Sequence, residues 1–228
     1  MPENSKDLTA SEISRLLGKL DGELERRGQR VVLYVVGGAN ISLALDARRS
    51  TKDIDAVVKR GFDVVSDAAK EVAKSETGLG ADWLNSDFTG GTPDGGLSWS
   101  WMDNKDDDTP SVAFSGKALD VELASPEMML ALKILAGRDK DLADIYLLMR
   151  KTGIKTPNDV GKNLARFSGR RIFDQQGAMG MPFHIDQRFA YVFDNAPDDL
   201  RPPASERKRN WLGVFGHRGK HLCRRSGK

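Results

Sequence analysis

The first apolar pattern along the chain is helical. Apolar residues recur every three or four positions over residues 9–27, with Thr9 or Ser11 placed to cap the start and Gly28 to end the helix. These apolar positions are Ile13, Leu16, Leu17, Leu20 and Leu24. The spacing predicts an amphipathic helix that turns one face toward a core.

Two short apolar runs follow, and each predicts a strand. Residues 31–36 (VVLYVV) are continuously apolar and rich in β-branched side chains, which is typical of a strand buried on both faces. Residues 53–58 (DIDAVV) predict the next strand. Between them, Gly37-Gly38 ends the first run, and residues 39–47 (ANISLALDA) predict a short helix.

The rest of the pattern gives one more helix, then strands, then helices. The predicted helices cover 62–75, 126–136, 139–151 and 157–167, and the predicted strands cover 111–115 and 117–124. The order predicts an α/β (α+β) fold, in which helices flank a mixed sheet and a helical part follows it. We expect a core over 1–124, a helical segment over 125–170, and a C-terminal region, 171–228, without predicted elements.

Composition is that of a globular protein, with 39% hydrophobic and 30% charged residues. No apolar run reaches the length of a membrane span, and the first residues lack the order of a signal peptide. The one cysteine, Cys223, excludes an internal disulfide and a cysteine-based zinc site. A cytoplasmic location is the resulting expectation.

Charge is distributed unevenly along the chain. Residues 201–228 contain nine lysines and arginines and one acid, Glu206, whereas the first 200 residues contain 26 basic and 32 acidic side chains. A basic tail on an acidic body can bind phosphates, although many such tails are only solvated.

Candidate chemistry begins at Gly37-Gly38 and at Asp53 and Asp55. Glycines between a strand and a helix leave backbone amides open to phosphate oxygens at a helix N-terminus. Strand periodicity sends Asp53 and Asp55 to one face and Ile54 to the other. Magnesium prefers carboxylate oxygens, so the pair is a candidate Mg²⁺ site; the alternative is a strand end whose acids face water.

Gly37-Gly38 and the acid pair are stronger evidence for a binding site together than either is alone. They lie on consecutive predicted strands joined by one short helix, so we expect them to meet at one edge of the sheet. A phosphate cradle facing a pair of metal-binding acids is the arrangement of a nucleotide-transfer site.

In this pattern the chain resembles the polymerase-beta-like nucleotidyltransferase superfamily. The resemblance rests on VVGGANISLALDARRSTKDIDAVV, an apolar strand, Gly-Gly, a fourteen-residue gap and Asp-apolar-Asp. Arg49 and Thr51, ahead of the acids, are similar to the segment that precedes the pair in many of these enzymes. The resemblance implies a nucleotidyltransferase-type fold, an NTP as substrate, Mg²⁺ held by Asp53 and Asp55, and nucleotide binding by Gly37, Gly38, Arg49 and Thr51.

A second block, residues 125–148, resembles the helical segment of bacterial AbiEii-type nucleotidyltransferases. That family has a helix lysine and a downstream pair of aspartates beside the nucleotide, which here are Lys133, Asp141 and Asp144, with Arg138 a lesser candidate. Lys133 stands among apolar residues and needs an anionic partner or a route to solvent; the alternative is a lysine on the exposed face of its helix.

Many superfamily members use a third carboxylate on a later strand. In KALDVELAS, Asp120 and Glu122 share one face, and we favour Asp120; both acids can equally line the solvent side of an edge strand. Asp120 or Asp141 is then the candidate proton acceptor.

The AbiEii-type resemblance implies the toxin of a toxin–antitoxin pair, with RNA, notably tRNA ends, as acceptor and a cognate antitoxin protein as partner. The basic tail, with Trp211, Phe215, His217 and His221 among its cations, suits an RNA backbone. Two alternatives stay open: transfer to a small molecule such as an aminoglycoside or to a protein, and an inactive binding module of the same fold.

Overall fold

The computed structural model describes residues 6–45, 49–60, 62–86, 105–168 and 185–201. The chain divides into two compact units, Met1–Met129 and Leu130–Lys228, called here the sheet unit and the helical unit. Helix α4, Pro126–Ala136, runs across the division.

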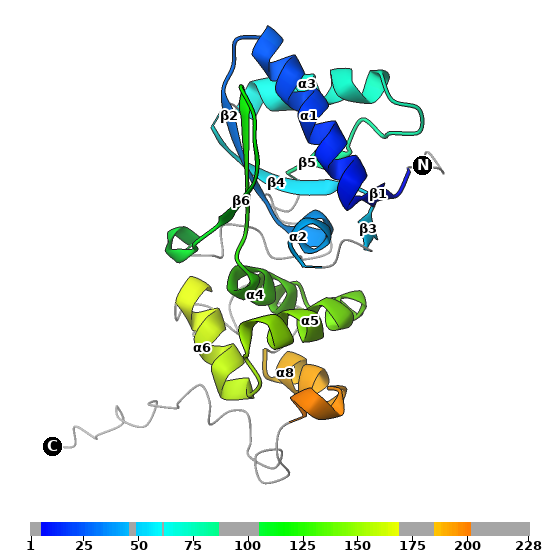
Figure 1. Ribbon diagram of the computed structural model, residues 1–228. Coiled ribbons are helices and arrows are strands. Elements are labelled where there is room, and N and C mark those ends of the chain that lie inside the picture. Colours follow the sequence, from blue (N-terminus) through cyan, green and yellow to red (C-terminus); the bar gives the residue numbers. More distant parts are fainter. Residues whose placement is uncertain (1–5, 46–48, 61, 87–104, 169–184, 202–228) are drawn as a thin grey trace, which may run out of the picture. The chain divides into compact units, whose positions relative to one another are not determined.

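The sheet unit contains the predicted mixed sheet (Figure 1). Its strands are β2 Val31–Val35, β4 Ile54–Arg60, β5 Leu84–Asn85, β6 Ser111–Ser115 and β7 Leu119–Leu123. Their order is β5-β4-β2-β7-β6, with β2 parallel to β7 and antiparallel to β4. Two further short strands, β1 Leu8–Thr9 and β3 Ser50–Thr51, pair with each other. The α/β prediction is confirmed.

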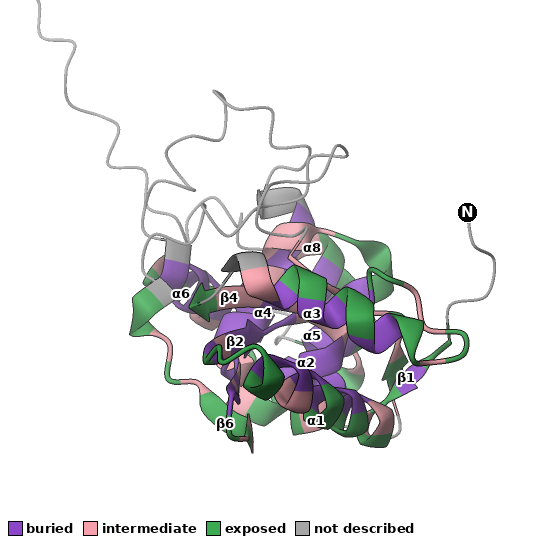
Figure 2. Ribbon diagram, turned by 90° about the horizontal axis from the view of Figure 1, so that it is seen from above, coloured by how far each residue is buried: buried purple, intermediate pink, exposed green. Residues whose placement is uncertain are grey.

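Among the described residues, three α-helices lie wholly in this unit: α1 Ala10–Arg26, α2 Gly37–Ala44 and α3 Phe62–Lys74. A turn of 3-10 helix, η3 Lys105–Asp107, precedes β6. Helices α1 and α3 pack together on one face of the sheet, where the predicted leucines of α1 join the inward residues of β2, β4 and β7 in one core. Figure 2 shows both helices with alternating buried and exposed positions, as their amphipathic sequences require.

Local chemistry explains the start of α1. The backbone N–H of Glu12 donates to the Thr9 hydroxyl over 3.4 Å, and the backbone N–H of Thr9 donates to the Glu12 carboxylate over 3.1 Å. This reciprocal capping box confirms Thr9, not Ser11, as the cap.

The helical unit holds the remaining elements of the described residues. They are the end of α4, η4 Asp139–Asp141, α5 Leu142–Thr152, α6 Pro157–Ser168, α8 Ile185–Asp194 and η5 Asp198–Leu200. Gly153 ends α5 in a left-handed conformation, φ 72°, which glycine adopts without steric cost. Within the described residues, no helix is long and apolar enough to span a membrane.

Two differences from the sequence expectations concern the site. Strand β4 begins at Ile54, so Asp53 precedes the strand instead of lying in it. Helix α2 begins at Gly37, so both glycines belong to its first turn. Helix α8, in the region for which the pattern predicted nothing, is a third difference: it buries Phe189, Val192 and Phe193.

Candidate functional site

A glycine turn joins β2 to α2. Gly37 takes a positive φ of 67°, which L-residues with a side chain rarely adopt. The N-cap residue, Val36, is extended and supplies no side-chain hydrogen bond to the first turn of α2. The start of this eight-residue helix therefore presents backbone amides without a side-chain cap.

The glycine turn lies against the start of β4. A β-carbon on Gly37 would overlap Asp55 Oδ2, and a β-carbon on Gly38 would lie 2.6 Å from Thr51 Oγ1. The backbone N–H of Val36 also donates to the carbonyl of Asp55 over 2.9 Å. Because β2 and β4 are antiparallel, the end of one meets the start of the other, and the glycines come together with Thr51 and with Asp55, one of the two predicted acids.

The two acids flank a core residue. Ile54 is fully buried, whereas Asp53 and Asp55 are half-buried. Strand β5 lies beside them: Asn85 pairs with Asp55, and its side-chain amide donates to Asp53 Oδ2 over 3.4 Å. Asn85 is not recognisable from the sequence, because a two-residue strand leaves no periodic signal.

This oxygen-rich corner fits a hard cation. Its donors are the carboxylates of Asp53 and Asp55 and the hydroxyl of Thr51, and glycine at 37 and 38 leaves room beside two of them. Magnesium takes oxygen ligands and completes its shell with water and substrate phosphates, so two protein carboxylates suffice. Across the described ranges, no group of three or more His, Cys, Asp or Glu side chains gathers at one point.

Asp120 lies elsewhere on the sheet. It pairs with Val32, three residues from Val35 at the end of β2, or about 10 Å at the usual rise of a strand. Its carboxylate accepts from Ser115 over 2.7 Å and binds Arg30 over 2.8 Å. The hydrogen bond from Ser115 and then the Arg30 charge lower the pKa of Asp120, which makes it a weak proton acceptor. The structure does not bring Asp120 together with Asp55.

Glu122 and Tyr34 form a second polar group on that face. Glu122 binds Lys59 over 2.6 Å, and the same ammonium lies 4.8 Å from the centre of the Tyr34 ring. The Tyr34 hydroxyl donates to Asp108 over 2.5 Å. Burial and then the Asp108 carboxylate raise the pKa of Tyr34 far above its usual value, so Tyr34 remains a neutral donor.

Arg49 follows α2 and is held by its backbone. Its carbonyl accepts a hydrogen bond of 3.2 Å from the buried hydroxyl of Ser42 in α2. The segment that leads to the acid pair is thus attached to the helix that follows the glycines.

In the helical unit, Lys133, Asp141 and Asp144 form one buried cluster. Lys133 Nζ lies 2.6 Å from Asp141 Oδ1 and 2.9 Å from Asp144 Oδ2. All three residues are less than 7% exposed. Lys133 therefore has the anionic partners that its apolar surroundings require, and the expectation of an exposed lysine is excluded.

Arginines complete this cluster. Arg138 Nε lies 2.7 Å from Asp141 Oδ2, and the buried Arg188 of α8 donates to the backbone carbonyl of Arg138 over 2.8 Å. Burial tends to raise the pKa of Asp141, but Arg138 and Lys133 outweigh it and hold that pKa below its ordinary value. Asp141 is thus an ionised structural partner and a poor base.

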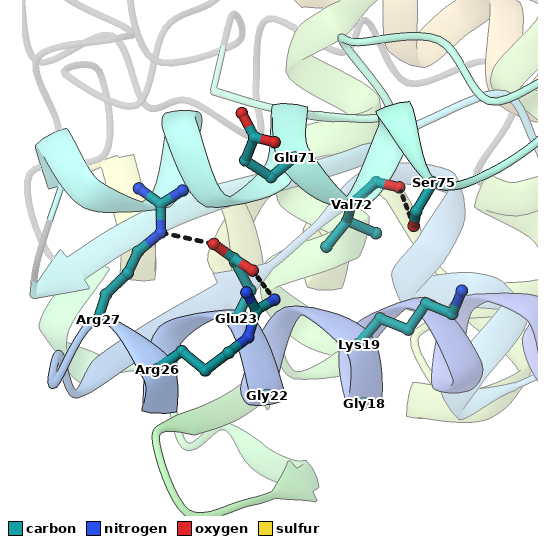
Figure 3. A pocket seen from close by; sticks show the side chains of 9 residues that line it. All are labelled: Gly18, Lys19, Gly22, Glu23, Arg26, Arg27, Glu71, Val72 and Ser75. Atoms are coloured by element: carbon teal, nitrogen blue, oxygen red, sulfur yellow. Dashed lines mark hydrogen bonds and ion pairs between the residues drawn. The ribbon is translucent and has the colours of Figure 1, made fainter.

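A separate groove lies between α1 and α3 (Figure 3), with a volume of about 490 Å³. In Figure 3, Glu23 reaches between Arg26 and Arg27, which both bind it. None of the candidate site residues lines this groove. The basic tail, residues 201–228, lies outside the described residues apart from Arg201.

Comparison with known proteins gives one structural likeness. No protein-family model matches the sequence, and no curated protein matches it. Among solved structures, the chain is similar to an antigenic nucleotidyltransferase-like protein from Paracoccidioides brasiliensis. The identity is 19%, the TM-score 0.39, and the alignment covers 83% of this chain and all of that one. A likeness this distant carries no conclusion about catalysis.

Proposed function

We propose that this protein is a Mg²⁺-dependent nucleotidyltransferase that moves a nucleotidyl group from an NTP to the end of an RNA. The observation that supports the proposal is the contact between the glycine turn and the start of β4. One corner of the sheet unit thereby combines uncapped backbone amides, which bind phosphate, with half-buried carboxylates, which bind a cation that phosphate shares.

Each group has a distinct task. The amides of the α2 N-terminus bind the triphosphate, and glycine at 37 and 38 lets its oxygens approach the backbone. Asp53 and Asp55 hold Mg²⁺, and Asn85 orients Asp53. When bound, Mg²⁺ neutralises charge on the triphosphate and lowers the pKa of an acceptor hydroxyl. The acceptor oxygen forms its bond to the α-phosphorus, and the bond from that phosphorus to the oxygen bridging it to the β-phosphorus breaks. Pyrophosphate leaves, and the hydroxyl proton passes to solvent water.

RNA as acceptor is supported by the charge of the chain. Nine basic residues over 201–228, with an acidic body before them, suit a polyanionic acceptor that must approach a site containing two carboxylates. With the motif resemblance of residues 125–148, this favours tRNA ends as the acceptor, the toxin of a toxin–antitoxin pair as the role, and an antitoxin protein as the partner.

The test is incubation of the full chain with each labelled triphosphate, Mg²⁺ and total tRNA. We expect label in tRNA and release of pyrophosphate, and loss of both in Asp53→Asn and Asp55→Asn. Asp67→Asn, a neutralised carboxylate on the exposed side of α3, is the matched control and should retain transfer. Transfer that persists in Asp55→Asn refutes the proposal.

A chain lacking residues 202–228 separates the acceptors. If RNA is the acceptor, this deletion reduces transfer to tRNA while binding of Mg²⁺-NTP stays unchanged, and added salt weakens transfer by the full chain. Undiminished transfer by the deleted chain, or label on a small molecule or on protein, contradicts the RNA assignment alone.

A further inference from the structure

Asn40 is a buried polar residue that none of the roles above uses. It lies in α2, three residues after Gly37, and is 1% exposed. Its side-chain amide donates to two backbone carbonyls, that of Val35 over 3.1 Å and that of Ala124 over 3.0 Å. Both protons of one carboxamide are therefore used on backbone oxygens.

These carbonyls belong to the ends of two parallel strands. Val35 is the last residue of β2, and Ala124 follows the last residue of β7. The backbone N–H of Ala124 also donates to the Val35 carbonyl over 3.1 Å. Asn40 therefore binds at the last hydrogen bond between β2 and β7. One residue further on, Val36 donates to Asp55. Asn40 thus ties α2 to the strand ends beside the acid pair.

Helix α2 needs such a tie. It has only eight residues, begins with two glycines and lacks a side-chain N-cap, and short helices of this kind are unstable alone. Buried Ala39 and Ile41 supply apolar contact, which has no direction. The two hydrogen bonds of Asn40 have direction and fix where the first turn of the helix stands.

We propose that Asn40 is the positioning residue of the glycine turn. Its amide holds the N-terminus of α2 against β2 and β7, so that the amides of Gly37 and Gly38 face the triphosphate beside Asp55. The identity of the ligand rests on the proposed function. The role of Asn40 in fixing the position of α2 does not. Aspartate has nearly the same shape but would place a charged oxygen against two carbonyls, and leucine has no donor at all.

Two variants of the full chain test whether Asn40 fixes the position of α2: Asn40→Leu and Asn40→Asp. Asp21→Ala is the matched control, because Asp21 accepts from the backbone N–H groups of Ala118 and Leu119, both over 2.8 Å, at the other end of β7. Hydrogen exchange of the amides over 41–45 should become about tenfold faster in both Asn40 variants, and unchanged in the control. Unchanged exchange in α2 overturns the proposal. If Asn40→Leu does not fold, the exchange rates of Asn40→Asp alone test the proposal.

Kinetics give the second readout. In the Asn40 variants KM for the triphosphate should rise about tenfold while kcat changes less, because the binding amides move and the carboxylates stay. The control, Asp21→Ala, should keep the KM and kcat of the wild type, even if its melting temperature falls as much as that of the Asn40 variants. Equal KM in Asn40→Asp and in the wild type overturns the proposal. If the wild type binds no triphosphate, the proposed function fails, and the exchange rates alone decide the role of Asn40.

Discussion

Gly37 and Asp55 lie so close together that a β-carbon on Gly37 would overlap the Oδ2 atom of Asp55. The two residues come from different elements, α2 and β4, and are brought together because β2 and β4 run antiparallel. The contact links a backbone able to bind phosphate to a side chain able to bind a cation.

Alanine at position 37 should damage both stability and binding. It would impose a left-handed φ on an L-residue, at about 1–2 kcal/mol, and its β-carbon would displace the Asp55 carboxylate. We expect a lower free energy of unfolding by denaturant and loss of Mg²⁺-NTP binding. Gly28→Ala is the control, since Gly28 has a φ of 64° and open space around it. It should lose stability only.

Position 38 offers a paired test with Thr51. A β-carbon on Gly38 would stand 2.6 Å from Thr51 Oγ1, so Gly38→Ala should destabilise the protein. Thr51→Ala removes that oxygen, and the double variant should therefore be more stable than the sum of the single effects predicts. Strict additivity in denaturant unfolding would show that the two residues do not touch.

The buried cluster in the helical unit predicts a stability effect. Lys133→Met would leave Asp141 and Asp144 buried without the ammonium between them, at about 3–5 kcal/mol. Thermal unfolding measures the loss. Lys162→Met, a lysine on the exposed side of α6, should cost little. Equal stability of the two variants contradicts the structural role of Lys133.

Asp141 also predicts a dependence on pH. Its pKa is lower in the folded than in the unfolded protein, so the ionised carboxylate contributes stability that is present above the ordinary aspartate pKa of about 4. That contribution is lost as pH falls through the lowered folded-state pKa. The unfolding free energy of the wild type should therefore fall more steeply in acid than that of Asp141→Asn. Parallel profiles would exclude the effect.

Much of the fold follows from periodicity. The leucines of α1 and the apolar run of β2 each predicted both an element and its buried face, because burial imposes the spacing. The glycine turn and the acid pair were equally visible, since Gly-Gly and Asp-Ile-Asp are local signals. Their contact was predictable only as a consequence of adjacent strands.

Other parts of the site depend on long-range pairing, which leaves no local mark. Asn85 lies on a two-residue strand. Asn40 has the sequence context of an ordinary polar residue in a short helix, and its role depends on a contact with Ala124, which is distant in the sequence. Asp120 alternates with core residues as a ligand would, but its register places it opposite Val32, beside Arg30. Register is a property of the assembled sheet.

Binding of Mn²⁺, a paramagnetic substitute for Mg²⁺, tests the central claim most directly. Electron paramagnetic resonance should show one Mn²⁺ site that strengthens when a triphosphate is added to the wild type or to Asp67→Asn. In Asp53→Asn and Asp55→Asn, affinity should fall by about 100-fold while the proteins stay folded. Equal Mn²⁺-triphosphate binding by all four proteins would contradict the claim that these two carboxylates and the glycine turn form one site.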